Sequence, residues 1–261
     1  MNNHTKRLRI FAGPNGSGKT TLYNYLTQVN AFHTYFHINP DQITKDLAIS
    51  LNLDNWPIEI SYTDLENFLN NSPFQDFVDF NLSKSLIFSN NQLSLRDPTI
   101  NNSYLSAAIA DFLRFKMLQS NSSFSYESVF SHHSRISEVE NAKKEKFRIY
   151  LYFITTSDPI INLQRVKNRV INGGHDVPNE KIHLRFFRTM NNIYSLFRLS
   201  DRAYFFDNSK ENSHLNLLAE KRDDNLFISC KNKVPQWFDE FLLKNLSDQP
   251  ILKPRKANDN E

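Results

Sequence analysis

Glycine constrains this chain most, because it is rare and gathered in two places. The 261 residues include five glycines, against about 18 expected at an average usage of roughly 7%. Three lie in the run Gly13-Pro14-Asn15-Gly16-Ser17-Gly18-Lys19-Thr20, and two form the pair Gly173-Gly174. A chain keeps glycine where the backbone needs a positive φ or a close approach. Both motifs are therefore expected to be loops of defined geometry.

The first motif fits the pattern of a phosphate-binding P-loop. It follows the apolar run Leu8–Ala12 and precedes a helical pattern over Thr20–Gln28, the context that the pattern requires. Backbone amides and the positive end of the helix would surround the phosphates, Lys19 would bridge the β- and γ-phosphates, and the Thr20 hydroxyl would bind Mg²⁺. An ordinary glycine turn is the alternative, but strand, spacing, lysine, threonine and helix all coincide. The predicted residues for ATP and Mg²⁺ are Gly13, Pro14, Asn15, Gly16, Ser17, Gly18, Lys19, Thr20 and Thr21.

Apolar strands that alternate with helical patterns predict an α/β fold with a mainly parallel sheet. We expect an insertion at about residues 52–100, where periodicity is weak, with short helices near 63–69 and 74–86. A hairpin, a short helix and a flexible tail at 246–261 are expected to complete the chain. The predicted strands are 8–12, 35–39, 124–130, 148–154 and 203–206; the helices are 20–28, 39–51, 103–119, 133–146, 159–172 and 179–197; the hairpin is 215–221 with 226–231, followed by the helix 237–243.

Composition excludes several classes of protein. The single Cys230 excludes an internal disulfide framework and a four-thiolate zinc site, and it favours a reducing compartment, so a cytoplasmic location is expected. No apolar run approaches the roughly 18 residues that cross a bilayer, so no membrane partner is expected. Residues 50–100 carry seven acidic side chains against Lys84 and Arg96. That charge argues against a nucleic-acid partner.

Three carboxylates follow or interrupt predicted strands. Asp41, in Ile38-Asn39-Pro40-Asp41, is expected near the γ-phosphate because parallel strands share one crevice at their carboxyl ends. It would accept a hydroxyl proton or position Mg²⁺, or else it caps its helix. Glu127 either points into the cleft or is a satisfied edge carboxylate. Asp207 is either part of a metal shell or a strand-end cap.

Arginines flank the second glycine motif. Arg165 and Arg169 are four residues apart and share a helix face. With the Gly-Gly-His175-Asp176 turn, they suit a lid over about 165–190 that would offset charge on a phosphoryl group in transfer. The alternative is that these arginines face solvent. His175 would serve the lid or only the turn.

Four motifs in this order resemble the zeta-toxin-like P-loop kinases: Phe11 to Thr20, Ile38 to Asp41, Tyr126 to Ser131, and Arg165 to Pro178 with Phe206 to Ser209. The resemblance implies a kinase-type P-loop NTPase fold, a three-layer sandwich, as one domain over 1–245. It also implies ATP-dependent phosphoryl transfer to a hydroxyl, with a UDP-activated N-acetyl sugar as acceptor and an antitoxin as protein partner.

By the same resemblance, Asp41 is the general base, Lys19 holds the phosphates, and Arg169 with Arg165 acts from the lid. Glu127 and Ser131 lie in the acceptor pocket. The Gly-Gly-His-Asp-Val-Pro form of the lid turn resembles the chromosomal branch of the family. This lid turn and the acidic insertion are the two departures from the toxin pattern.

Two other functions stay open. The first is an ATP-gated protein-interaction module, or an ATPase without a small-molecule acceptor, suggested by the acidic, aromatic segment from Trp56 to Phe88. The second is a nucleic-acid kinase, which the acidic insertion disfavours. An ABC-type ATPase lacks its second glycine-rich signature here, and a GTPase lacks its Asn-Lys-x-Asp segment.

Replacing Lys19 tests the phosphate loop. Lys19→Ala removes a charged hydrogen-bond donor to the phosphates, so we expect ATP affinity to fall roughly 10- to 100-fold. Isothermal titration calorimetry measures this change. Unchanged affinity would contradict the P-loop assignment.

Overall fold

The structure, a computed structural model, describes residues 5–33, 36–173, 177–210, 215–223, 225–229, 234–246 and 252–254. It divides into two compact units, which we describe separately. Unit 1 comprises Met1–His33 and Glu127–Glu261, and unit 2 comprises Thr34–Tyr126. The expected turn residues Gly174, His175 and Asp176 and most of the expected tail lie outside the described residues.

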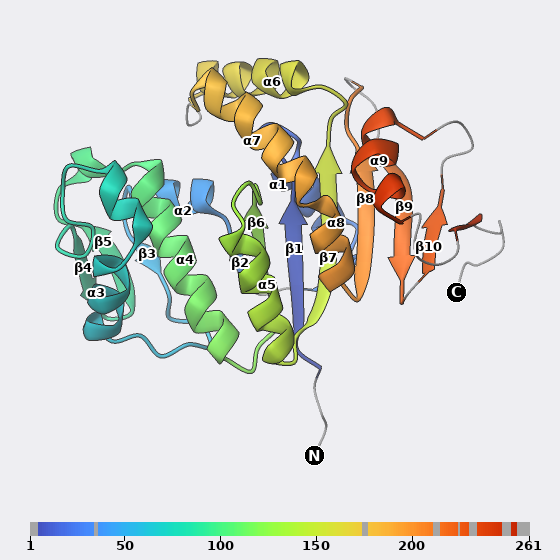
Figure 1. Cartoon of the computed structure of the whole chain (residues 1–261). Helices are drawn as coiled ribbons and strands as arrows, with labels where there is room; N and C mark the ends of the chain where they lie inside the picture. Colours follow the sequence, from blue (N-terminus) through green and yellow to red (C-terminus); the bar gives the residue numbers. More distant parts are fainter. Residues whose placement is uncertain are drawn as a thin grey trace. The chain divides into compact units, whose positions relative to one another are not determined.

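A twisted sheet forms the centre of unit 1 (Figure 1). Its strands follow the order β11-β10-β9-β8-β7-β1-β6. β1, β7 and β8 are parallel, β9 is antiparallel to both of its neighbours, and β11 is parallel to β10. The strands are β1 (Arg7–Ala12), β6 (Phe124–Ser128), β7 (Arg148–Thr155), β8 (Arg202–Asp207), β9 (Asn216–Arg222), β10 (Asn225–Ile228) and β11 (Leu252–Pro254).

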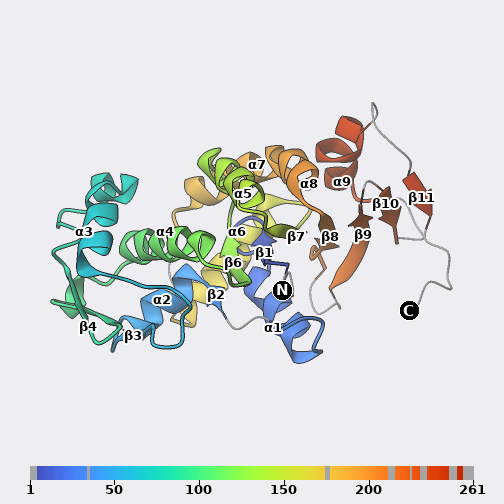
Figure 2. The ribbon, with the colours of Figure 1, turned by 90° about the horizontal axis from the view of Figure 1, so that it is seen from below.

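Helices cover both faces of this sheet and so make three layers (Figure 2). One face carries α1 (Lys19–Gln28), and the other carries α5 (Ser134–Lys144), α7 (Asn179–Asn191), α8 (Ile193–Leu199) and α9 (Gln236–Phe241). α6 (Pro159–Ile171) lies beyond the carboxyl ends of the strands. Burial on both faces explains the apolar run of β7. The predicted α/β class with a mainly parallel sheet is confirmed.

Aromatic rings fill the space between α1 and the sheet. Phe11 stacks on Tyr152 with ring centroids 4.8 Å apart, and Tyr23 of α1 meets Phe11 edge-on at 5.2 Å. Leu22 is fully buried in the same cluster. The start of α1 is thereby fixed on β1, the strand that leads into the glycine loop.

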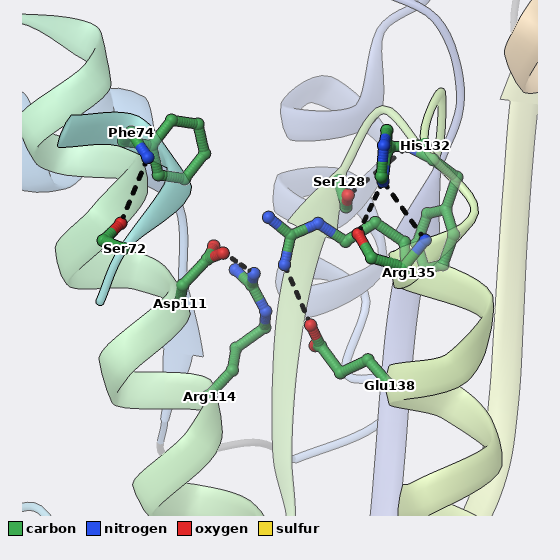
Figure 3. Close-up of polar contacts among 10 residues, drawn as sticks. Ser72, Phe74, Asp111, Arg114, Ser128, His132, Arg135 and Glu138 are labelled. Atoms are coloured by element: carbon green, nitrogen blue, oxygen red, sulfur yellow. Dashed lines mark hydrogen bonds and ion pairs between the residues drawn. The ribbon is translucent and has the colours of Figure 1, made fainter. Parts of the chain in front are cut away.

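Unit 2 is built around α4 (Ser103–Gln119), which has the bounds that its apolar spacing predicts. α2 and α3 pack on α4, and β2 pairs in parallel with the first part of β6. Within α4, Arg114 is buried and pairs with Asp111 (Figure 3). The other elements are β2 (His37–Ile38), α2 (Pro40–Asp46), β3 (Leu51–Asn52), α3 (Tyr62–Asn70), the 3₁₀ turns Pro73–Phe77 and Pro98–Ile100, β4 (Leu86–Ser89) and β5 (Gln92–Leu95).

The insertion differs from its expected helical form. The helix expected over 74–86 is wrong: a 3₁₀ turn ends at Phe77, and β4 and β5 form a hairpin that β3 extends. Asn90 and Asn91 take φ values of 48° and 53° at the hairpin turn. Asparagine tolerates this left-handed conformation, which two-residue hairpins require. Strands of four residues are too short for an alternation of apolar and polar residues to be recognised in the sequence.

Two expected helices are also shorter than predicted. The helix expected over 39–51 ends at Asp46, and the one expected over 179–197 divides into α7 and α8 at Asn192. In the described residues, no helix combines the length and the apolar character that crossing a membrane requires.

Removing the Phe11 ring tests the packing of α1 on the sheet. Phe11→Ala deletes a fully buried ring, so we expect the free energy of unfolding to fall by about 3–5 kcal/mol. Urea denaturation measures the change. Tyr25→Ala, at a position 51% exposed on the same helix, is the control and should stay within about 0.5 kcal/mol of the parent protein.

Candidate functional site: the phosphate loop and its surroundings

Close packing of the glycine loop explains why its glycines are needed. A Cβ on Gly13 would lie 2.0 Å from the Ile154 carbonyl oxygen, and one on Gly16 would lie 2.6 Å from the Asn162 carbonyl oxygen. Gly16 and Gly18 also take φ values of 73° and 102°. The loop therefore rests directly on the end of β7 and on α6, and side chains at these positions would push it away.

Positive charge gathers where the loop enters α1. Lys19 Nζ donates hydrogen bonds to the carbonyl oxygens of Gly13 and Pro14, each over 2.9 Å. α1 begins at Lys19 after Gly18, and its first turn contains no acidic residue. The helix dipole and the lysine thus act in the same direction, toward an anion.

Glu127 meets the loop through Thr20. The Thr20 hydroxyl donates to Glu127 Oε2 over 2.9 Å, and Glu127 is 7% exposed. The Gly13 amide donates to the Ser128 carbonyl oxygen over 3.3 Å, which fixes the end of β6 beside the loop. Burial, with a smaller contribution from the charge of Glu127, raises the pKa of Tyr23 on α1. The contact places Glu127 beside the loop and also satisfies one of its carboxylate oxygens, so it is compatible with both alternatives for this residue.

Two asparagines brace the loop from outside, and sequence reasoning missed them. Asn162 Nδ2 donates to the Asn15 carbonyl oxygen over 2.6 Å, and Asn208 Nδ2 donates to the Ser17 carbonyl oxygen over 2.9 Å. Asn162 is fully buried on α6. The sequence contains no sign that Asn162 contacts the loop, because its burial follows from the packing of α6. Asn208 follows β8, inside the segment that carries part of the resemblance.

α6 presents the predicted arginines beside this brace. Val166 packs within 3.2 Å of a Cβ placed on Gly16, so the face of α6 that carries Asn162 and Val166 contacts the loop. Arg165 lies next to Val166, and Arg169 follows Val166 by three residues. One guanidinium nitrogen of Arg165 is buried without a hydrogen-bond partner. Both arginines are half-buried, which argues against a purely solvent-facing role.

The loop that contains Ser131 is held by α7 and its end. Thr189 Oγ1 donates to the Val129 carbonyl oxygen over 2.7 Å, and Asn192 Nδ2 donates to the Phe130 carbonyl oxygen over 2.8 Å. Phe130 takes a φ of 56°. Ser131 is half-buried in this loop.

The same loop leads into α5, where two further contacts hold its start. Arg135 pairs with Glu138 over 2.9 Å, and the His132 ring contacts the Ser134 hydroxyl over 2.8 Å (Figure 3). Both ends of the Ser131 loop are thus tied to helices.

Asp207 is occupied by contacts within the fold. Trp237 Nε1 donates to Asp207 Oδ2 over 2.7 Å, and the Ser209 amide donates to Asp207 Oδ1 over 3.0 Å. Both carboxylate oxygens therefore accept bonds from the chain. Of the two alternatives, this geometry favours the strand-end cap.

Asp41 lies in unit 2, in the first turn of α2. The helix cap is Asn39, whose side chain accepts from the Asp41 amide over 2.9 Å. Capping therefore does not account for Asp41, whose side chain is exposed. Thr44 Oγ1 bonds to Ser106 Oγ over 2.8 Å and fixes α2 on α4.

Several solved structures are similar to this chain in fold. A chain in the native AvrRxo1-ORF1:ORF2 complex has a TM-score of 0.56 and 15% identity, covering 94% of this chain and 66% of its own length. A chain in the AvrRxo1-ORF1:ORF2 structure with ATP has a TM-score of 0.52 and 16% identity, covering 84% of this chain and 59% of its own length. The present chain thus spans less than two thirds of these proteins.

A chain from the PezAT chromosomal toxin-antitoxin system of Streptococcus pneumoniae has a TM-score of 0.50 and 11% identity, covering 93% of this chain and 80% of its own. No family model matches the sequence, and no curated protein is similar to it. At such low identity the comparisons show the fold alone. They support the α/β fold with a mainly parallel sheet that the sequence predicts.

Removing the Asn162 brace tests how far the loop is preorganised. Asn162→Ala deletes the bond to the Asn15 carbonyl, so we expect ATP affinity to fall about tenfold, the equivalent of one buried hydrogen bond. Calorimetric titration measures the affinity, and a thermal melt shows whether the variant folds. Asn168→Ala, on the exposed side of the same helix, is the control. Equal losses in the two variants would refute a bracing role.

Proposed function

We propose that this protein is a phosphotransferase that moves the γ-phosphate of ATP to a hydroxyl group of a small molecule. The observation that carries the proposal is the contact between Thr20 and Glu127, made beside Lys19 at the start of α1. It joins a phosphate loop to a buried carboxylate from another strand. A loop with that carboxylate suits phosphoryl transfer, which depends on positioning and charge stabilisation.

The residues present fit a Mg²⁺–ATP complex. Mg²⁺ prefers oxygen ligands, and the Thr20 hydroxyl and the Glu127 carboxylate place two such oxygens 2.9 Å apart. In this proposal Thr20 would hold the ion, and Glu127 would fix the orientation of the Thr20 hydroxyl through their hydrogen bond. Mg²⁺, when bound there, would offset the negative charge of the phosphates during transfer.

Lys19, Arg165 and Arg169 supply the remaining positive charge. Lys19 is already held at the loop by the Gly13 and Pro14 carbonyl oxygens. Arg165 and Arg169 extend from the helix that packs on the same loop. As lid arginines, they would offset the charge spread over the transferred group.

Asp41 is proposed as the general base for the acceptor hydroxyl. Its support is the sequence context and the finding that Asn39 performs the capping. Glu127 and Ser131 are proposed at the acceptor side, with a UDP-N-acetyl sugar or another nucleotide-linked alcohol as substrate. An antitoxin is proposed as protein partner, since one similar structure belongs to a toxin-antitoxin system.

Incubation with Mg²⁺ and γ-labelled ATP tests the reaction. The acceptor panel contains UDP-sugars, nucleosides and dinucleotides, and Lys19→Ala is the inactive control. Label on one acceptor, absent with the control variant, would support the proposal and identify the substrate. ATP binding without transfer to any acceptor, or transfer that survives in Lys19→Ala, would contradict it.

Asp41→Asn separates catalysis from binding. Loss of a general base is expected to lower kcat roughly 100- to 10,000-fold, while ATP affinity stays the same because the phosphate loop is intact. Steady-state kinetics and calorimetry measure the two quantities. Asp46→Asn, on the same helix, is the matched control, and equal kcat values for the two variants would remove Asp41 from the mechanism.

A second candidate is the ATP-gated interaction module. A groove of about 520 Å³ in unit 2 lies among α3, the following 3₁₀ turn and α4, so the acidic and aromatic segment forms one of its sides. It is lined by Asp64, Asn67, Phe68, Asn71, Ser72, Pro73, Asp111, Phe115, Lys116 and Gln119. A pulldown that depends on ATP and on this groove, without phosphoryl transfer, would favour the module.

A further inference from the structure

Strand register in unit 1 brings arginines and tyrosines together on one face of the sheet. Arg9 of β1 pairs with Tyr150 of β7, Tyr150 pairs with Arg202 of β8, and Arg202 pairs with Arg222 of β9. Paired residues on neighbouring strands project to the same side. In the next row along β1 and β7, Arg7 pairs with Arg148. We call the surface of Arg7, Arg9, Arg148, Tyr150, Tyr152, Arg202, Tyr204 and Arg222 the arginine–tyrosine face.

This face lies on the α1 side of the sheet. Tyr150 and Tyr204 pack against the cluster that contains Phe11, Tyr152 and Leu22 of α1. In the described part of the chain, α1 is the helix on this side, while α5, α7, α8 and α9 cover the opposite side (Figure 2). Tyr150, Arg202, Tyr204 and Arg222 remain partly exposed.

Positive charge on the face exceeds negative charge. Its five arginines are accompanied by one carboxylate, Glu220, which pairs in register with Tyr204. α1 contributes no acidic residue, since its sequence is Lys-Thr-Thr-Leu-Tyr-Asn-Tyr-Leu-Thr-Gln. The Nε atoms of Arg9 and Arg202 are buried without a hydrogen-bond partner. Because these two atoms are buried, a carboxylate from outside would meet the outer guanidinium nitrogens of partly exposed arginines such as Arg148 and Arg202.

Three of the aromatic rings on this side of the sheet are stacked on one another. Tyr152 lies between Phe11, at 4.8 Å and 8°, and Tyr204, at 5.1 Å and 13°. Both faces of the Tyr152 ring are therefore occupied within the sheet. Single-stranded nucleic acids gain affinity by stacking bases on exposed ring faces. Arg9 and Arg148 also lie over the Tyr150 ring, at 5.5 and 5.8 Å. The face therefore offers a ligand guanidinium groups more than open ring faces.

One contact on the face already shows the chemistry that it favours. Arg222 binds Glu220 through two hydrogen bonds, Nε to Oε1 over 2.8 Å and Nη2 to Oε2 over 3.0 Å. The planar guanidinium matches a carboxylate in this two-point geometry. Arg148 on β7, next to β1, and Arg202 on β8, next to β9, carry the same guanidinium group.

We propose that the arginine–tyrosine face binds an extended, acidic segment of a partner protein. The segment would cross the strands from β1 to β9, and its carboxylates would pair with Arg148 and Arg202. This surface does not include the phosphate-loop residues, so its occupation is independent of ATP. The proposal therefore stands apart from the phosphotransferase function.

Fluorescence anisotropy with a labelled peptide tests the proposal. The probe alternates Glu and Ser over about eight residues, enough to cross four strands spaced about 4.8 Å apart. Arg202→Gln removes one two-point pairing, so its Kd should rise about tenfold. Arg148→Gln, nearer the start of its strand, should have the same effect and provides a second variant if the first fails a thermal melt.

Three controls make the result decisive. Arg96→Gln changes an exposed arginine of unit 2 and should leave peptide binding unchanged, as should Lys19→Ala. A peptide with Gln in place of Glu should not bind. The proposal fails if the acidic peptide does not bind, if Arg96→Gln weakens binding as much as Arg202→Gln, or if a single-stranded oligo-dT displaces the peptide and binds more tightly.

Discussion

The close approach of the glycine loop to its supports is the constraint on which unit 1 depends. With Gly13 against the end of β7 and Gly16 against α6, the loop has no room for side chains. This packing fixes both the direction in which α1 leaves the loop and the position of α6 beyond the carboxyl ends of the strands. The two positive features of the site, the start of α1 and the arginines of α6, are thus set by the same contacts.

The electrostatics of the site follow from that packing. Lys19 and the first turn of α1 concentrate positive charge without a neighbouring acid in the helix. Glu127 is the buried carboxylate that reaches the loop, and it does so through a hydroxyl that P-loops use for Mg²⁺. A buried carboxylate is costly unless it is hydrogen-bonded or paired. The hydrogen bond that Glu127 accepts from Thr20 offsets part of this cost.

Charged side chains are also concentrated on one side of the sheet in unit 1. On the α1 side, arginines alternate with tyrosines across the strands, while the opposite side is covered by helices and contains apolar rings such as Phe153 and Phe205. Arg9 lies over the Phe32 ring at 4.8 Å, so part of its guanidinium is held by cation–π contact. The same unit therefore combines the glycine loop at one end of the sheet with a basic flank.

The sequence by itself determined the glycine loop, the alternation of strands and helices, and the whole of α4. Each of these depends on interactions between residues that are close together in the chain. The sequence also located Asp41, Arg165 and Arg169 on their helices, while their roles stay predictions. The sequence did not predict the short hairpin of β4 and β5, because this hairpin depends on strand pairing and not on a visible alternation of apolar and polar residues. Tertiary structure alone decided that Glu127 meets Thr20 from 107 residues away. It alone decided that Asn162 and Asn208 brace the loop and that arginines from four strands share one face. These outcomes depend on strand register and helix packing, which are set by the burial of the whole core and are not encoded in any one segment.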